Sequence, residues 1–179
     1  MFIRIIIGGS TGTGRVSYIT KLISDLVLVS SAQYYNILII RAEVLTNNGV
    51  IPLAIYYNKD GIFGDMFTED FYKSADGALI FYDPSVEVTF TRALEEIKYI
   101  KNLNSGIPII LCRNRNNFIP PQTDDSTLPV PLYKVFVKLD YNIVEPLQDL
   151  IQRICGKNII ICRSPIPEKL FPLSLFAEV

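Results

Sequence analysis

Nine consecutive residues near the start of the chain have the types and spacing of a loop that binds phosphate. They are Gly9, Ser10, Thr11, Gly12, Thr13, Gly14, Arg15, Val16 and Ser17. An apolar run at residues 2–7 precedes them, and apolar residues at helical spacing follow. Such a loop can turn its backbone N–H groups, and the N-terminus of the next helix, toward an anion. The segment therefore predicts the strand, loop and helix that open a nucleotide-binding α/β fold.

Two residues of this loop change the chemistry that the pattern G-x-x-x-x-G-K-[ST] supports. In that pattern the lysine reaches the β- and γ-phosphates, and the hydroxyl binds Mg²⁺. Here Arg15 has the place of the lysine, and Val16 has the place of the hydroxyl. Arginine keeps the positive charge but is a wide planar fork, and valine has no atom that ligates a cation. We therefore expect at most weak binding of a nucleotide phosphate, and no Mg²⁺ site.

The loop by itself leaves three interpretations open. It can be a phosphate cradle, or a glycine-rich turn kept for its backbone geometry alone. It also resembles the dinucleotide loop of atypical short-chain reductases, in which Arg15 would lie near a phosphate of NADP. That interpretation requires a Tyr-x-x-x-Lys pair on a suitable helix, which the sequence lacks. It also requires a charged residue just after the second strand, for which Arg41 is a poor candidate.

The composition predicts one ordinary domain and excludes several classes of chemistry. The chain has 179 residues, of which 49% are hydrophobic and 20% charged, so it can bury a full core. A formal net charge of −1 provides no field for nucleic acid or an anionic membrane. The absence of histidine excludes histidine-dependent triads and histidine-based zinc sites. We predict no catalytic residue and no metal site.

The cysteines and the apolar runs indicate the cellular compartment that we expect for the protein. Cys112, Cys155 and Cys162 form no C-x-x-C pair, so we expect reduced thiols in a cytoplasmic or nuclear protein. No apolar run reaches the roughly 18 residues of a membrane span, and no membrane association is predicted.

Apolar and β-rich runs predict the remaining elements. Strands are expected at residues 36–45, 50–56, 78–82, 108–112 and 133–138. An Asn-Gly step at residues 48–49 predicts a hairpin between the first two of these. Helices are expected at residues 15–26, 86–103 and 143–155, and irregular segments at 58–70 and 118–131. The order predicts a doubly wound α/β sheet of about six strands, mixed because one is antiparallel.

The end of the sequence differs in character from the rest. Residues 1–158 are expected to form one domain, followed by an apolar extension at residues 159–179 that contains Pro165, Pro167 and Pro172. This extension is too apolar to lie free in water, so we expect it to pack on the domain or on a partner.

Over almost its whole length the chain resembles the Ras superfamily of small GTPases, most closely the Ran type. Gly12-Thr13-Gly14 matches the loop of that type, and residues 74–83 resemble the segment that ends in a strand and an aspartate. Residues 106–115 are similar to the strand that leads into the guanine-binding N-K-x-D, and residues 141–156 resemble the last helix. The resemblance implies a Ras-like P-loop NTPase fold with one antiparallel strand.

The same resemblance shows where the chain departs from the family. The guanine-binding residues that it implies are Asn114, Arg115, Asn117 and Lys138. Asn117 replaces an aspartate, which implies weaker guanine selectivity because the charge-assisted pair of hydrogen bonds is lost. The family's D-x-x-G-Q falls at residues 58–62, where Asn58 replaces the aspartate and Ile62, or Gly61 in a register shifted by one, replaces the glutamine. The switch threonine falls near Tyr34 or Tyr35. Hydrolysis requires these groups, so its loss is implied.

The resemblance therefore implies a pseudo-GTPase that acts as a protein-interaction module or as a subunit of an assembly. Two alternatives remain: a guanine-nucleotide-binding protein with slow or no hydrolysis, as in nucleocytoplasmic transport, and the NADP-binding reductase-like protein. The partners that the resemblance implies are transport factors of the importin type.

Three further groups of residues have competing interpretations. Aromatic residues in the regions that correspond to the switches can fill space or form a partner-binding surface; they are Tyr34, Tyr35, Phe63, Phe67, Phe71 and Tyr72. Asp124 and Asp125 are interpreted as a solvated turn and not as a metal pair. Glu95 and Glu96, with nearby lysines, are interpreted as an exposed helix face.

Overall fold

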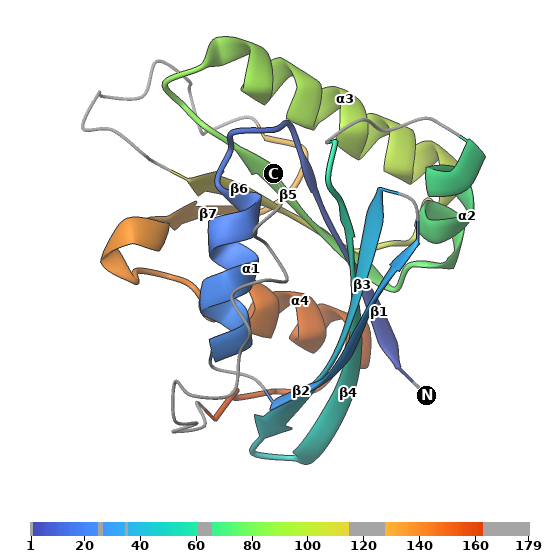
Figure 1. Ribbon diagram of the computed structural model, residues 1–179, viewed down its shortest axis with the longest axis vertical. Helices are drawn as coiled ribbons and strands as arrows, with labels where there is room; N and C mark the ends of the chain where they lie inside the picture. The colour runs from blue at the N-terminus through green and yellow to red at the C-terminus, as the bar shows by residue number, and fades with distance from the viewer. Residues whose placement is uncertain (1, 25–26, 35, 61–65, 115–127, 163–179) are drawn as a thin grey trace.

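The computed structural model describes residues 2–24, 27–34, 36–60, 66–114 and 128–162, which form one mixed sheet with helices on both faces (Figure 1). The sheet has seven strands in the order β2-β3-β4-β1-β5-β6-β7. They are β1 (Ile3–Gly9), β2 (Val27–Tyr34), β3 (Ile37–Thr46), β4 (Gly49–Asn58), β5 (Gly77–Tyr82), β6 (Ile109–Asn114) and β7 (Leu132–Val135). β3 is antiparallel to both of its neighbours, and the pairs from β4 through β7 are parallel.

Helices cover the two faces in pairs. α1 (Arg15–Ser24) and α4 (Glu145–Cys155) lie on one face, and α2 (Met66–Ser74) and α3 (Glu87–Leu103) on the other (Figure 1). A 3₁₀ turn, η2 (Val137–Leu139), follows β7. Among the described helices none is long and apolar enough to cross a bilayer.

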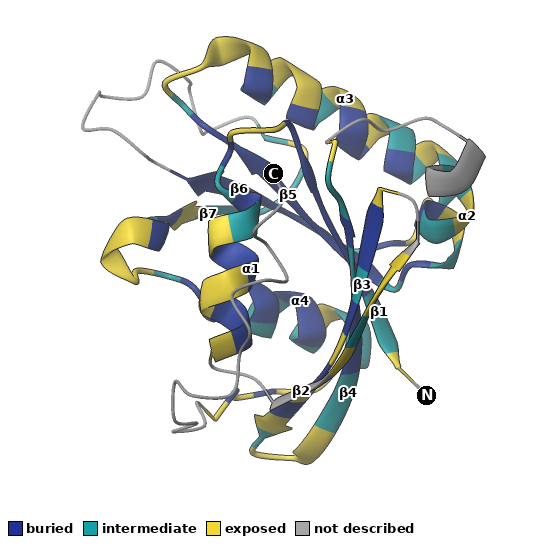
Figure 2. Cartoon of the chain, viewed as in Figure 1, coloured by how far each residue is buried: buried dark blue, intermediate teal, exposed yellow. Residues whose placement is uncertain are grey.

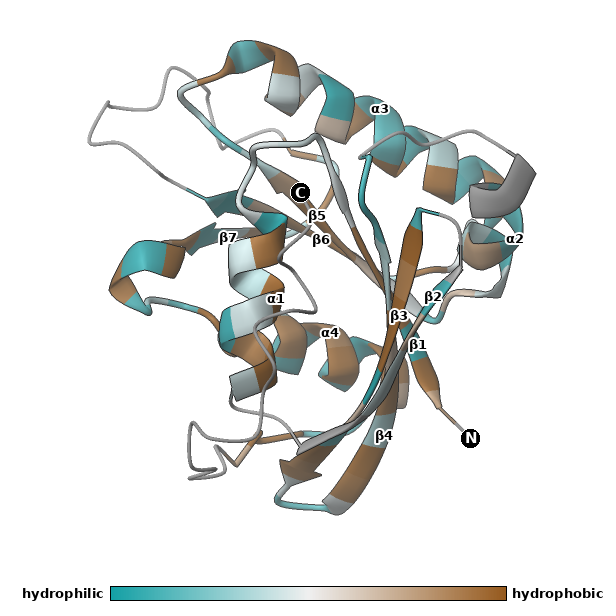
Figure 3. Cartoon of the chain, viewed as in Figure 1, coloured by the Kyte–Doolittle hydropathy of each residue, from teal (hydrophilic) through white to brown (hydrophobic). Residues whose placement is uncertain are grey.

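Each face of the sheet has its own core because successive side chains of a strand point to opposite sides. Ile5 and Ile7 pack under α1 and α4, whereas Ile6 packs under α2 and α3. β5 and β6 are buried at every position, and the central strands are accordingly buried and hydrophobic in Figures 2 and 3. Continuous apolar runs are what strands covered on both faces require.

Most predicted elements are confirmed, and the strand count is wrong. The hairpin at the Asn-Gly step joins β3 to β4, and Gly156 ends α4 in the left-handed conformation. The seventh strand is β2, which pairs with β3 at the edge of the sheet. It was missed because the helical pattern was extended to residue 26, whereas α1 ends at Ser24. The short run of residues 27–34 has little alternation that would mark a strand.

Two further boundaries are corrected. Residues 58–70 were expected to be irregular, but α2 begins at Met66, and its Lys73 and Glu69 form an i,i+4 ion pair of 3.0 Å. The last strand was expected at residues 133–138, but β7 ends at Val135.

The beginning of the C-terminal extension packs on the domain, as one of the two predicted alternatives requires. Ile159 and Ile161 are buried, and Ile161 forms an antiparallel bridge with Thr46 at the end of β3. Residues 163–179 lie outside the described residues. All three cysteines are free.

Candidate functional site

The glycine loop connects β1 to α1 and has a backbone that only glycine adopts easily. The φ angles of Gly9, Gly12 and Gly14 are 112°, 80° and 83°. A Cβ at Gly9 would overlap the carbonyl oxygen of Phe81, and a Cβ at Gly14 would overlap the side-chain amide of Asn114. Gly9 and Gly14 are therefore required by the neighbouring strands β5 and β6, irrespective of any ligand.

Arg15, the first residue of α1, is held at the end of β4. Its Nη1 donates to the carbonyl oxygen of Asn58 at 2.9 Å, and its guanidinium lies 4.9 Å from the centre of the Tyr57 ring. The residue is only 3% exposed, and desolvation lowers the pKa of its guanidinium. A guanidinium with these partners is engaged by the protein itself, whereas the lysine of the pattern reaches phosphate.

The next two residues of the helix present no metal-binding hydroxyl to the loop. Val16 is partly buried against the core under α1, and Ser17 is exposed. Among the described residues no three Asp, Glu, Cys or His side chains lie together as a metal would require.

A buried carboxylate lies directly beneath the loop. Glu96 of α3 is 3% exposed; its Oε2 accepts from the N–H of Gly9 at 2.8 Å, and its Oε1 accepts from the hydroxyl of Tyr72 at 2.9 Å. Desolvation raises the pKa of Glu96, and its two hydrogen bonds and the charge of Arg15 oppose that rise. Burial, reinforced by Glu96, likewise raises the pKa of Tyr72. The cluster joins α2, α3 and the loop.

The expectation that Glu95 and Glu96 form an exposed face is wrong for Glu96. The buried residues of α3 are Thr89, Ala93, Glu96, Ile97 and Ile100. Glu96 is three residues after Ala93 and four before Ile100, so helical periodicity places it on the buried stripe. This spacing could have predicted that Glu96 is buried, but a charged residue is ordinarily expected on the exposed side of a helix. Glu95 is exposed as predicted.

Asn114 ties the loop to the end of the sheet. Its Nδ2 donates to the carbonyl oxygen of Thr13 at 2.9 Å, and its Oδ1 accepts from the N–H of Val137 at 3.4 Å. It is 1% exposed. Both ends of its amide are thus engaged within the protein. Lys138, the next residue after Val137, is exposed, and Arg115 and Asn117 lie outside the described residues.

The loop nevertheless keeps the features that bind an anion weakly. The Oγ of Thr13 donates to the carbonyl oxygen of Ser10 at 2.8 Å, which closes the turn. The Oγ of Ser10 is buried without a hydrogen-bond partner among the described residues. The first N–H groups of a helix have no acceptor within the helix, so those at the start of α1 can take an anion.

The segment after β4 is held by side chains. The Oδ1 of Asn58 accepts from the N–H of Asp60 at 3.0 Å, and the carboxylate of Asp60 accepts from the Asn36 amide at 2.6 Å. The N–H of Lys59 donates to the carbonyl oxygen of Asn36 at 2.8 Å. Of the switch-region aromatics, Tyr72 is buried and Phe71 packs 5.0 Å from the Tyr56 ring. Tyr72 therefore fills space inside the domain, whereas Phe71 is only partly buried, so that both interpretations stay open for it.

The stability of the protein should depend on pH through Glu96. Its pKa is raised in the folded protein above the ordinary value of 4.5, so folding favours its protonated form. The contribution is present below pH 4.5 and is lost as pH rises through the folded-state pKa. In Glu96→Gln the amide still accepts from Gly9 but does not titrate. We therefore expect the wild type to lose stability relative to this variant as pH rises from about 4.5.

Urea unfolding from pH 4 to pH 8 measures this difference. Glu95→Gln, at the exposed neighbouring position, is the matched control and should keep the wild-type profile. Parallel profiles for the wild type and Glu96→Gln would contradict the expectation.

No protein-family model matches the chain, and no curated protein matches its sequence. The site is therefore characterised by its geometry: a glycine loop whose arginine, asparagine and underlying glutamate are all engaged within the protein.

Proposed function

We propose that the protein is a degenerate member of the Ras superfamily, of the Ran type, that acts as a pseudo-GTPase: a protein-interaction module or assembly subunit. The α/β architecture supports this, since the one antiparallel strand of the mixed sheet is β3, which lies between β2 and β4 after α1 in the chain. A Rossmann-type reductase has a mostly parallel sheet in which a helix crosses over between the first two strands. The β3–β4 hairpin is unlike that arrangement, which disfavours the reductase interpretation.

The position of Arg15 is the observation that carries the proposal. Phosphoryl transfer requires a cation on the phosphates, Mg²⁺ and a group that orients water. Arg15 donates to Asn58 and lies against Tyr57, and Val16 packs into the core. Arg15 is thus engaged by internal contacts, and an apolar side chain has the place of the Mg²⁺-binding hydroxyl. Both observations support a fixed surface over a nucleotide-dependent switch.

The second candidate is a protein that keeps a guanine nucleotide as a structural ligand, without Mg²⁺. The buried hydroxyl of Ser10, which has no hydrogen-bond partner in the described part of the chain, favours it. So do the first N–H groups of α1, which have no acceptor within the helix. In this alternative Asn114 would have to exchange an internal hydrogen bond for one to the base.

Titration with fluorescent GTP, GDP, ATP and NADPH, with and without Mg²⁺, distinguishes these functions. We expect no Mg²⁺-dependent binding and no turnover by the wild type. The variant R15K/V16S restores both residue types of the pattern and should bind GTP more tightly than the wild type, with Mg²⁺ dependence. Micromolar Mg²⁺-dependent GTP binding with turnover by the wild type would sink the pseudo-GTPase proposal. Tight Mg²⁺-independent GDP or GTP binding would support the structural-ligand alternative.

The partners follow from the resemblance only. Importin-type transport factors, or the other subunits of an assembly, are the proteins that the Ran-type resemblance suggests, in the cytoplasm or nucleus. A groove on the sheet, lined by Arg4 and Arg41, indicates the chemical character of the partner.

A further inference from the structure

Among the described residues, helices cover only part of one face of the sheet. α2 and α3 pack over β1, β5 and β6 through a cluster that includes Ile6, Ile80 and Leu111. On the same face, beyond α2, the beginning of β1 and the strands β4 and β3 line an open groove of about 390 Å³. The groove is distinct from the glycine loop, which lies at the other end of β1.

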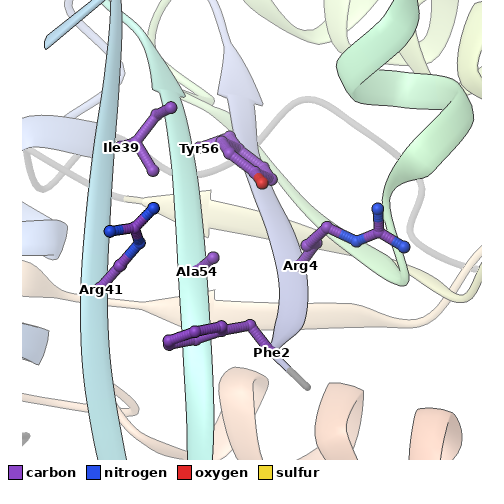
Figure 4. A pocket seen from close by; sticks show the side chains of 6 residues that line it. All are labelled: Phe2, Arg4, Ile39, Arg41, Ala54 and Tyr56. Carbon is purple, nitrogen blue, oxygen red and sulfur yellow. The ribbon is translucent and has the colours of Figure 1, made fainter. Parts of the chain in front are cut away.

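The groove has an apolar floor between two arginines. Phe2, Ile39, Ala54 and Tyr56 line it together with Arg4 and Arg41. Figure 4 shows Arg41 on β3 and Arg4 on β1, on opposite sides of Ala54. Both charged residues that line the groove are positive.

Of the two arginines, only Arg4 has a carboxylate partner among the described residues. Arg4 forms a 3.5 Å ion pair with Asp76, and its side chain remains 39% exposed. The guanidinium of Arg41 lies 5.9 Å from the centre of the Phe2 ring and has no carboxylate partner among the described residues. An exposed arginine stacked on an aromatic ring presents its donors in a fixed fork, which suits a carboxylate.

The exposed face extends past the groove along the hairpin, where Glu43 lies between Arg41 and the apolar Leu45. Leu45 and Val50 are register partners in β3 and β4, and they are 38% and 52% exposed. By alternation they lie on the same face as Arg41 and Ala54. From Val50 to Tyr56 this face is about 20 Å long, at about 3.3 Å per residue. That length exceeds a small ligand and suits a polypeptide, and arginine and aromatic residues are enriched at the centres of protein interfaces.

We propose that this face of the β1–β4–β3 sheet docks an acidic segment of a partner protein. A large apolar side chain of the segment enters the floor formed by Ile39, Ala54 and Tyr56. Flanking carboxylates of the segment bind Arg41 and Arg4. The inference rests on the proposed function as an interaction module and specifies the chemistry of its partner.

Two capped peptides of matched shape test the proposal on the full chain. One is acetyl-Gly-Glu-Phe-Glu-Gly-amide, and the other has lysine in place of both glutamates. In ¹H–¹⁵N NMR titrations we expect the acidic peptide alone to shift the amides of Ile39, Arg41 and Ala54. Arg41→Glu should weaken its binding about tenfold and should let the lysine peptide bind instead. Arg92→Glu, an equal charge change at an exposed position of α3, should leave binding unchanged.

Several results would overturn the proposal. These are equal shifts with both peptides, shifts confined to other surfaces, no shifts at all, or no effect of Arg41→Glu. A peptide of residues 163–179 that shifts the same amides more strongly would make the chain's own extension the occupant. Concentration-dependent shifts of these amides without peptide, with dimers in sedimentation, would make it a second copy. Nucleotide binding is measured separately, so a GTPase activity would overturn the proposed function and leave this result standing.

Discussion

Gly9→Ala is expected to destabilise the domain by about 4 kcal/mol, because it combines a strained backbone angle with a clash against backbone atoms. The φ of Gly9 is 112°, in a region that L-residues rarely adopt, and the added methyl would overlap the carbonyl oxygen of Phe81 in β5. The carbonyl cannot move aside without breaking the pairing of β1 with β5, in which Gly9 is opposite Phe81. Urea unfolding followed by circular dichroism measures the loss.

Gly12→Ala is the matched control within the same loop. Gly12 also has a positive φ, of 80°, but a Cβ there would meet nothing within 4 Å. Only the backbone strain remains, so we expect a loss of about 1 kcal/mol. Equal losses for the two variants would show that the approach of β5 does not constrain the loop. The expected inequality means that Gly9 is required by the approach of β5, so that its presence is not by itself evidence of a bound nucleotide.

Local patterns predicted the architecture well. The apolar run before the loop, the helical spacing after it and the Asn-Gly step each specify an element through residues close in sequence. Gly156 marks the end of α4 for the same reason. β2 was missed because its run has little alternation, and pairing with β3 decides its structure. α2 was missed although its apolar residues are as periodic as those of α1, because it begins inside a segment that was expected to be irregular. Tertiary contacts override local propensity in such segments.

The candidate site was predicted only in part, because its chemistry depends on long-range contacts. The sequence identified Arg15 and Val16 as departures from the phosphate-binding pattern. It could not show that Arg15 donates to Asn58, a residue 43 positions away. Glu96 is 87 positions from Gly9, and nothing local indicates that its carboxylate accepts from that N–H group. The groove likewise combines residues of β1, β3 and β4.

Glu96→Ala is the second large effect that we expect, a loss of about 3 kcal/mol. The substitution leaves the N–H of Gly9 and the hydroxyl of Tyr72 buried without their acceptor, at about 1–3 kcal/mol for each unsatisfied group. It also removes the negative charge that faces the buried Arg15. The substitution also removes the free-energy cost of burying the carboxylate, which offsets part of the loss. Chemical denaturation at neutral pH measures the difference from the wild type.

Glu95→Ala, one residue away on the exposed side of α3, should change stability by no more than about 0.5 kcal/mol. A similar loss in both variants would mean that helix propensity, and not the buried cluster, sets the cost. Tyr72→Phe separates the two hydrogen bonds, because it removes one donor and leaves the acceptor for Gly9 in place. In the Glu96→Ala background Tyr72→Phe should cost less than in the wild type, since the hydroxyl has already lost its partner. Such coupling would show that α2 and α3 hold the glycine loop through one carboxylate, without a nucleotide.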